Sequence, residues 1–202
     1  MILGFVDLPF RPLLPRRTER LVIRAYTGAD LDAVLAYQSL PEVARYIPWQ
    51  PRTPESMAAL MERKVAATAL ANDDDVLELA VTLGADGRLI GEVLLFLRSA
   101  EHQTGEIGWA LDPAHQGRGY ATEAAREILR MAFDDVGLRR MIARIDARNV
   151  ASRRVCERLG MRREAELLEN QWIDGELTSE VDYGLLRREW RAGPVSRAAA
   201  RG

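Results

Sequence analysis

The sequence predicts one α/β (α+β) domain, in which helices cover both faces of a mixed and mostly antiparallel sheet. The first reason is the order of the runs along the chain: a strand, two helices, three strands, a helix, a strand, a helix and a final hairpin. The second is composition, because 48% hydrophobic and 29% charged residues are typical of a globular chain. The third is length, since 202 residues can bury one sizeable core.

The first part of the predicted domain contains one strand and two helices. Residues 21–26 have strand composition, and residues 27–30 supply capping residues for a helix that runs to about Gln38. Prolines in residues 39–54 indicate a loop. Residues 54–71 are rich in alanine, methionine and leucine, and they predict the second helix.

The second part predicts a meander, two helices and a closing hairpin. Asp-Gly turns separate the first two strands and the last two, which is typical of hairpins. The expected elements are strands at 76–83, 89–97 and 104–111, a helix at 120–136, a strand at 141–146, a helix at 151–159, and hairpin strands at 164–173 and 176–186. The organisation predicted from these runs is an N-terminal arm at 1–17, a domain at 18–191 and a flexible tail at 192–202.

Composition excludes several classes of function. A net charge of -2 gives no basic field for nucleic acid. Cys156 is the only cysteine, and His102 and His115 have no third ligand suggested nearby, so neither a disulfide framework nor a metal site is expected. Residues 1–14 lack the basic start of a signal peptide, and no apolar run could cross a membrane. We therefore expect a cytoplasmic protein, and the single lysine among 28 basic residues indicates a bacterial, GC-rich source.

The most informative segment is the loop that joins the strand at 104–111 to the helix at 120–136. Gly117 and Gly119 allow consecutive N–H groups to turn toward an anion at the positive end of that helix. Two glycines before a helix are also an ordinary turn, so the loop alone leaves both interpretations open. A Walker loop needs Gly-Lys-Ser/Thr, which is absent here, and a dinucleotide loop would follow the first strand of a parallel sheet.

The segment Gln116-x-x-Gly119-x-Ala121 matches the loop pattern Q/R-x-x-G-x-G/A. Through this loop the sequence resembles the GNAT superfamily of N-acetyltransferases. Further segments resemble its RimJ/RimL-like branch, which contains the ribosomal-protein N-terminal acetyltransferases: 18–24, 148–155, 157–161 and 182–190. The resemblance covers about residues 18–191. It implies the GNAT fold, a curved mixed sheet whose splayed centre admits a coenzyme from one side and an acceptor from the other.

The resemblance also implies acetyl-coenzyme A (acetyl-CoA) as cosubstrate, without a metal. Asn149 would hydrogen-bond the pantetheine arm, although an Asn before a helix is equally a candidate N-cap. The backbone of one strand segment would pair with that arm: Trp109, Ala110 and Leu111. Loop amides, with Arg118 as an extra cation, would hold the pyrophosphate: Gln116, Gly117, Arg118, Gly119, Tyr120 and Ala121.

Acetyl transfer to an amine requires a neutral amine, a polarised carbonyl and protonation of the departing thiolate. The resemblance makes Glu106 the candidate proton acceptor, and a solvated strand charge is the alternative. Where many members of the superfamily carry a tyrosine as proton donor, this chain has Cys156. Ser152, Cys156 and water are therefore the candidate donors, and position favours Ser152, three residues after Asn149 on the same helix face.

The expected acceptor is a primary amine, either a protein N-terminus or a small molecule. Its groove would form from residues 39–54 and 172–177, with three tryptophans lining it: Trp49, Trp109 and Trp172. Nearby acidic residues would favour a cationic acceptor: Glu42, Asp174 and Glu176. The alternative function is a non-catalytic acetyl-CoA sensor or partner module with the same fold. A homodimer through sheet edges or the N-terminal arm is compatible with the sequence.

Overall fold

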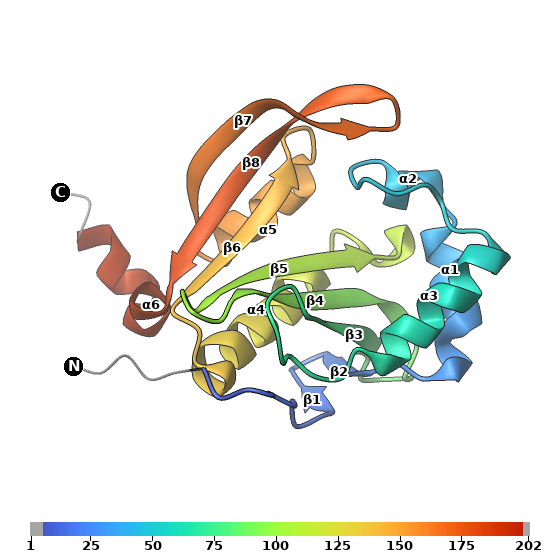
Figure 1. The fold of residues 1–202 in the computed structure, drawn as a ribbon, viewed down its shortest axis with the longest axis horizontal. Coiled ribbons are helices and arrows are strands. Elements are labelled where there is room, and N and C mark those ends of the chain that lie inside the picture. The colour runs from blue at the N-terminus through green and yellow to red at the C-terminus, as the bar shows by residue number, and fades with distance from the viewer. Residues whose placement is uncertain (1–5, 200–202) are drawn as a thin grey trace.

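An eight-stranded sheet forms the centre of the molecule (Figure 1). The computed structural model describes residues 6–199. The strands are β1 (Arg16–Arg17), β2 (Leu21–Ala25), β3 (Val76–Leu83), β4 (Leu89–Ser99), β5 (Thr104–Leu111), β6 (Arg140–Asp146), β7 (Arg162–Ile173) and β8 (Glu176–Leu186). They lie in the order β1-β2-β3-β4-β5-β6-β8-β7, and every pair is antiparallel except β5 with β6. The predicted mixed, mostly antiparallel sheet is thus confirmed.

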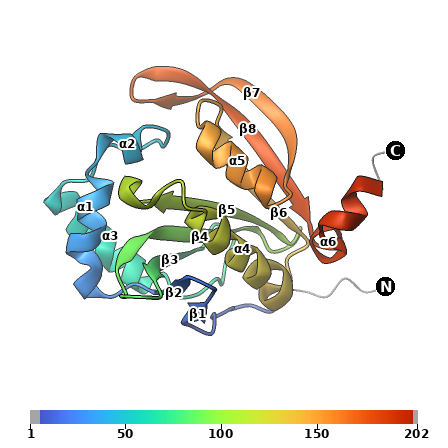
Figure 2. The same cartoon turned by 180° about the vertical axis from the view of Figure 1, so that it is seen from behind.

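Helices cover both faces of this sheet. They are α1 (Leu31–Gln38), α2 (Pro41–Ala44), α3 (Pro54–Ala66), α4 (Tyr120–Arg130), α5 (Val150–Arg158) and α6 (Arg187–Ala199). Figure 2 shows α4 and α5 side by side on one face, whereas α1 and α3 lie on the other. A 3₁₀ turn precedes α1 (Gly28–Asp30) and another follows β5 (Pro113–His115), and a π-helical segment extends α4 (Met131–Val136). The helices therefore leave one hydrophobic layer on each side of the sheet.

Each layer is filled by the apolar stripe of its helices. The larger core lies under α4 and α5, where Ile128, Leu129 and Cys156 are fully buried against sheet residues. The smaller core lies under α1 and α3, where Val34 and Met57 are fully buried. Both layers are anchored on the same central strands, so the position of β4 and β5 is fixed from two sides.

The central strands separate part-way along their length. Parallel pairing of β5 with β6 covers only three residues of each strand, and it ends at Glu106 opposite Ile142. Beyond that point β5 stays paired with β4 as far as Leu111, while β6 continues beside β8. Figure 1 shows the two strands diverging toward α2. Residues 107–111 therefore have one edge that β6 does not pair.

The structure differs from the predicted elements at several boundaries. The helix expected at 54–71 ends at Ala66, because the backbone of Leu70 pairs instead with Phe10 of the arm. The arm, expected to be irregular over 1–17, also contains β1, and the loop at 39–54 contains α2. The tail expected at 192–202 continues as α6 to Ala199 with a kink at Gly193, and residues 1–5 and 200–202 lie outside the described residues.

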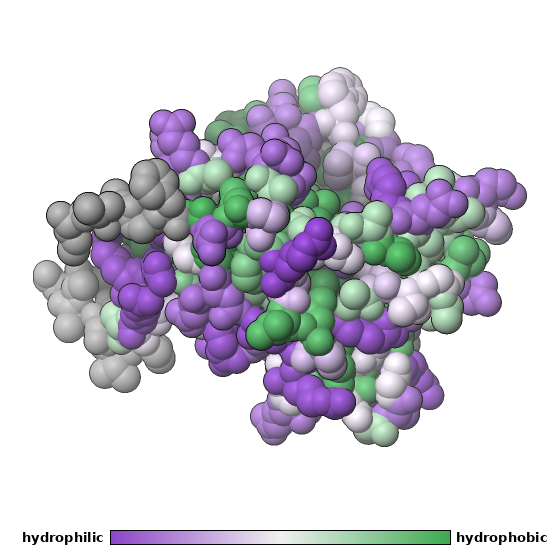
Figure 3. Space-filling model, turned by 60° about the horizontal axis from the view of Figure 1, so that its bottom comes forward, coloured by the Kyte–Doolittle hydropathy of each residue, from purple (hydrophilic) through white to green (hydrophobic). Residues whose placement is uncertain are grey.

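The surface near β1 is mainly hydrophilic, with smaller apolar areas between charged side chains (Figure 3). Leu13 of the arm is 85% exposed, whereas Leu14 beside it packs on the larger core. Across the described part of the chain, no helix is both long and apolar enough to span a lipid bilayer.

Candidate active site

The loop after β5 is shaped by local hydrogen bonds. The Asp112 carboxylate accepts from the Ala114 amide at 2.9 Å and so begins the 3₁₀ turn. The Gln116 side chain donates from Nε2 to the Leu111 carbonyl at 3.0 Å, which ties the loop to the end of β5. Gly117 and Gly119 have φ of +74° and +82°, torsions that glycine adopts without strain. The loop therefore turns directly into the first residues of α4.

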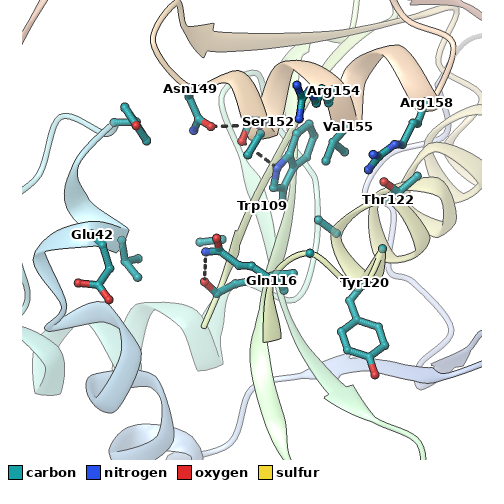
Figure 4. A pocket seen from close by; sticks show the side chains of 18 of the residues that line it. Glu42, Trp109, Gln116, Tyr120, Thr122, Asn149, Ser152, Arg154, Val155 and Arg158 are labelled. Carbon is teal, nitrogen blue, oxygen red and sulfur yellow. Dashed lines mark hydrogen bonds between the residues drawn. The ribbon is translucent and has the colours of Figure 1, made fainter. Parts of the chain in front are cut away.

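A pocket of about 350 Å³ lies between this loop, β5 and α5 (Figure 4). Its lining contains every residue predicted to hold the coenzyme except Arg118. Arg118 is exposed, and its backbone carbonyl accepts a hydrogen bond from Arg20 at 3.0 Å. A Cβ at Gly117 would meet no atom within 4 Å, so open space lies directly beside the loop backbone. The structure thus brings the predicted loop, strand and helix residues together around one cavity.

Among the lining residues that were not predicted from the sequence, three polar ones lie on α4 and α5. The Thr122 hydroxyl, in the first turn of α4, is buried and has no hydrogen-bond partner among the described residues. Arg154 and Arg158 lie one turn apart on α5, and Figure 4 shows Arg158 extending toward Thr122. An unpaired donor, two cations and a helix N-terminus fit the phosphates of a coenzyme. The i, i+4 spacing of the arginines was the available sequence signal.

A second pocket of about 620 Å³ lies on the other side of β5. It is lined by the α2–α3 segment, β5, β6 and the β7–β8 hairpin, and it includes the three tryptophans expected there. Its acidic residues are not those expected: they are Glu92, Glu106, Asp146 and Glu180. The two pockets share residues at the separated strand, namely Tyr46, Ile47, Trp109, Ala110, Asn149 and Ser152. The shared residues form the boundary between the two cavities.

The three acidic residues that were expected near the acceptor do not line the second pocket. Glu42 sits on α2, where it lines the first pocket. Asp174 and Glu176 lie at the tip of the hairpin, outside the lining of both pockets. Asp174 accepts from Gln50 Nε2 at 3.3 Å, and Glu176 pairs with Arg148 at 2.7 Å. These two residues therefore bridge structural segments at the rim.

The sequence matches the acetyltransferase (GNAT) domain family over residues 20–162. The chain belongs to the GNAT acetyltransferase family. Its predicted fold and reaction class are confirmed: it is an acyltransferase that depends on acetyl-CoA.

Some relatives of this GNAT chain are similar to it over nearly their whole length. The uncharacterized N-acetyltransferase YnaD of Bacillus subtilis (strain 168) is 35% identical over 178 residues, which cover 86% of this chain and 97% of YnaD. The crystal structure of a GNAT-family acetyltransferase from Bacillus anthracis superposes with a TM-score of 0.78 at 32% identity, covering 87% of this chain and all of that one. A second structure is that of a spermidine N-acetyltransferase from Vibrio cholerae in complex with CoA and spermine. It superposes with a TM-score of 0.74 and covers 86% of this chain and 99% of that one. At 20% identity this similarity shows the fold alone.

One hydrogen bond of the GNAT site connects β5 to α5 in the region where β5 and β6 are no longer paired. The Trp109 indole Nε1 donates to Ser152 Oγ at 3.3 Å, so β5 is connected to α5 across the boundary of the two pockets (Figure 4). Asn149 is the N-cap of α5, and its Oδ1 accepts from the Ser152 amide at 3.0 Å. The capping interpretation of Asn149 is therefore correct, and its side chain also lines both pockets.

Cys156 is buried in the larger core and lines neither pocket. Burial raises the pKa of its thiol to about 12, because the thiolate would lose its hydration. The thiol therefore stays protonated at neutral pH and packs as a small apolar side chain.

Glu106 lies at the last residue pair that joins β5 to β6, and it lines the second pocket. Arg98 donates to its Oε2 at 2.8 Å, and Arg144 donates to the same oxygen at 2.9 and 3.1 Å. The side chain is 11% exposed, so these charge-assisted hydrogen bonds lie in a partly desolvated site. Glu106 is therefore part of an ion-pair network, which the sequence did not reveal.

Proposed function

We propose that this GNAT enzyme transfers the acetyl group of acetyl-CoA directly to a primary amine, and that the two substrates enter from opposite sides of β5. The observation that carries the proposal is the pair of pockets that meet at Trp109 and Ser152. One pocket has donors and cations suited to a phosphorylated coenzyme, and the other has aromatic and acidic walls. Direct transfer needs both substrates to reach one point, which this arrangement supports.

The first pocket would hold the coenzyme mainly through backbone groups. The amides of residues 116–121 and the Thr122 hydroxyl would bind the pyrophosphate at the N-terminus of α4. The unpaired edge of β5 at 109–111 would hydrogen-bond the pantetheine amides as a neighbouring strand would. Arg154 and Arg158 would contribute positive charge near the phosphates. When bound, acetyl-CoA supplies a thioester carbonyl that can be attacked by an amine.

The chemistry at the boundary requires a proton acceptor and a proton donor. Ser152 is the proposed donor to the thiolate, because its hydroxyl lines both pockets and accepts from Trp109, which leaves its own proton free to point at sulfur. Backbone N–H groups of the unpaired β5 edge would polarise the carbonyl. The amine proton would pass, directly or through water, to a carboxylate of the acceptor pocket, and Glu106 is the one that the sequence resemblance implies.

The lining of the acceptor pocket favours an amine that is positively charged before it reacts. Glu92, Glu106 and Asp146 are ion-paired with basic side chains, so Glu180 is the wall carboxylate that would attract an ammonium group. Aromatic rings such as Trp49 and Trp172 offer flat surfaces for the attached carbon chain. The motifs that resemble the RimJ/RimL-like branch make a protein N-terminus one candidate. A small-molecule amine is the other, as in the spermidine enzyme with the same fold.

The proposal is tested by following thiol release from acetyl-CoA with a panel of amines that includes spermidine and short peptides with free N-termini. We expect turnover with at least one of these acceptors, and acetylation of its amine by mass spectrometry. Calorimetry with CoA gives the affinity of the first pocket independently. Coenzyme binding without turnover on any amine would instead identify a non-catalytic acetyl-CoA-binding module.

A further inference from the structure

Glu180 is a buried carboxylate in the wall of the acceptor pocket. It lies on β8 opposite Asp146 of β6, and only 4% of its surface is exposed. Its carboxylate accepts from two neutral side-chain amides, Asn170 Nδ2 at 3.3 Å and Gln171 Nε2. Gln171 lines the same pocket. Glu180 is thus held in place by hydrogen bonds that bring no compensating positive charge.

The charged groups around Glu180 come from β8 itself, β6 and β5. Asp182 lies two residues further along β8. Glu106 of β5 lines the same pocket as Glu180, and Asp146 and Arg144 lie on β6. Burial raises the pKa of the Glu180 carboxyl, and repulsion from Asp182 and Glu106 raises it further, which outweighs the attraction of Arg144. Asp182 also has a raised pKa, through burial and the nearby Glu106. Burial and the neighbouring carboxylates therefore increase the affinity of the Glu180 carboxylate for a proton.

Glu106 and Glu180 line the same pocket but have different partners. The Oε2 atom of Glu106 receives hydrogen bonds from two guanidinium groups, whereas Glu180 receives them from two amides and also lies within hydrogen-bond reach of the Asp182 carboxyl. An oxygen that already accepts several charge-assisted hydrogen bonds must give some of them up to bind a proton. Glu106 is therefore suited to hold Arg98 and Arg144 in place, and Glu180 is suited to exchange a proton.

We propose that Glu180 accepts the proton that the acceptor ammonium must lose, and that Glu106 is a positioning residue for Arg144. This inference rests on the proposed acetyl transfer. One N–H bond of the ammonium breaks and its proton binds to the Glu180 carboxylate, which leaves the nitrogen lone pair free. The lone pair then forms the C–N bond as the C–S bond breaks. The thiolate takes a proton from Ser152, which recovers one from the acylated nitrogen, and Glu180 returns its proton to water.

The test compares the pH dependence of kcat/KM for the wild type and Glu180→Gln, with the best amine of the panel. We expect the wild type to lose activity at acid pH with an apparent pKa above the ordinary glutamate value of about 4.3. The Gln variant should lose roughly 100-fold or more in kcat/KM at pH 7, as is usual for removal of a general base. Its remaining activity should rise steadily with pH, because solvent then deprotonates the amine.

Three comparisons separate this inference from its alternatives. Glu106→Gln should retain the acidic limb of the profile, and Glu166→Gln, an exposed change on β7, should resemble the wild type. CoA affinity by calorimetry should be unchanged in Glu180→Gln, which shows that the fold and the first pocket are intact. An inflection in the Glu180→Gln profile at the same acidic pH as in the wild type, or one that disappears only in Glu106→Gln, overturns the inference and leaves the acetyl transfer standing.

A measurement without turnover decides the case independently. The side-chain carboxyl carbon of Glu180 can be titrated by carbon-13 NMR in the wild type and identified by its loss in Glu180→Gln. We expect a titration midpoint clearly above the ordinary glutamate value of about 4.3. A midpoint at or below that value would overturn the inference even if no acceptor amine were found.

Discussion

The two pockets that meet at β5 are built from different parts of the chain. The coenzyme pocket consists mainly of one continuous strand, loop and helix start, residues 109–122, closed by α5 along its length and by residues 42–47 at and after α2. The acceptor pocket collects side chains from the α2–α3 segment, β4, β5, β6 and the closing hairpin. The first offers mainly backbone groups and helix ends to a ligand, whereas the second offers side chains. A ligand shared by a whole family suits the former, and a variable acceptor suits the latter.

This difference predicts that the two pockets respond to separate substitutions. Changes in the loop should remove coenzyme binding and leave the acceptor walls intact. Changes beneath the acceptor pocket should affect stability or turnover and spare coenzyme affinity. Residues that line both pockets, such as Trp109 and Ser152, are the exceptions.

The largest expected effect is that of Gly119→Glu on coenzyme affinity. The new carboxylate would lie beside the proposed pyrophosphate site, where two like charges about 4 Å apart repel by about 4 kcal/mol, or roughly a thousandfold in Kd. Gly119 has φ of +82°, so backbone strain adds to the cost. Gly87→Glu is the matched control, because Gly87 has φ of +73° in an exposed turn between β3 and β4. Calorimetry with CoA should show binding in the control and none in Gly119→Glu; equal affinities would remove the loop from the site.

A second large effect is expected under the acceptor pocket, at Lys64. Its ammonium is 3% exposed and pairs with Glu92, which lines that pocket, and with Glu78 at 2.5 Å. Lys64→Met would leave two buried carboxylates without their cation and should lower stability by about 3–5 kcal/mol. Arg63→Met, an exposed change on the same helix, is the control. Thermal unfolding should separate the two, with CoA affinity unchanged in both below the transition.

The sign of the pH dependence at Lys64 follows from its pKa. Burial alone would lower the pKa, but the attraction of Glu92 and Glu78 outweighs it and raises the value above the ordinary one. The ion pairs therefore stabilise the fold fully at neutral pH, and this contribution is lost only as pH rises above about 10.4 and through the folded-state pKa. A stability difference between wild type and Lys64→Met that vanished already at pH 8 would contradict this account.

The sequence was informative where function depends on local backbone geometry. The Gln116 to Ala121 loop could be identified because its glycines and its place between strand and helix are consecutive in the chain. Glu92 and Glu180 could not be identified, since they come from different strands and are brought to one pocket only by the sheet order. Likewise, the end of α3 depends on the contact of Leu70 with Phe10, some 60 residues away. Long-range pairing, rather than propensity, decided the features that were missed.

A smaller effect is expected for the residue that the pockets share on α5. Ser152→Ala removes the proposed proton donor and the acceptor of the Trp109 indole hydrogen bond, so kcat should fall several-fold with little change in CoA affinity. Ser56→Ala is a matched control, because Ser56 holds the same third position in α3 and lies outside both pockets. Steady-state kinetics should show no loss in the control. Unchanged kcat in Ser152→Ala would make water the donor.

The smallest effect is expected at Cys156, one turn further along α5 and on the side of the helix that faces the core. Its side chain is fully buried among apolar residues, so Cys156→Ala leaves a small cavity and should cost roughly 1 kcal/mol, or about 2–4 °C in Tm. Cys156→Ser keeps a proton donor but buries a hydroxyl, so it should be less stable than the alanine variant. Both should retain wild-type kcat, because the thiol lines neither pocket. The opposite result would be a loss of turnover in Cys156→Ala, partial activity in Cys156→Ser and full activity in Ser152→Ala. That result would make the thiol the proton donor and would place the reacting sulfur on the core side of α5.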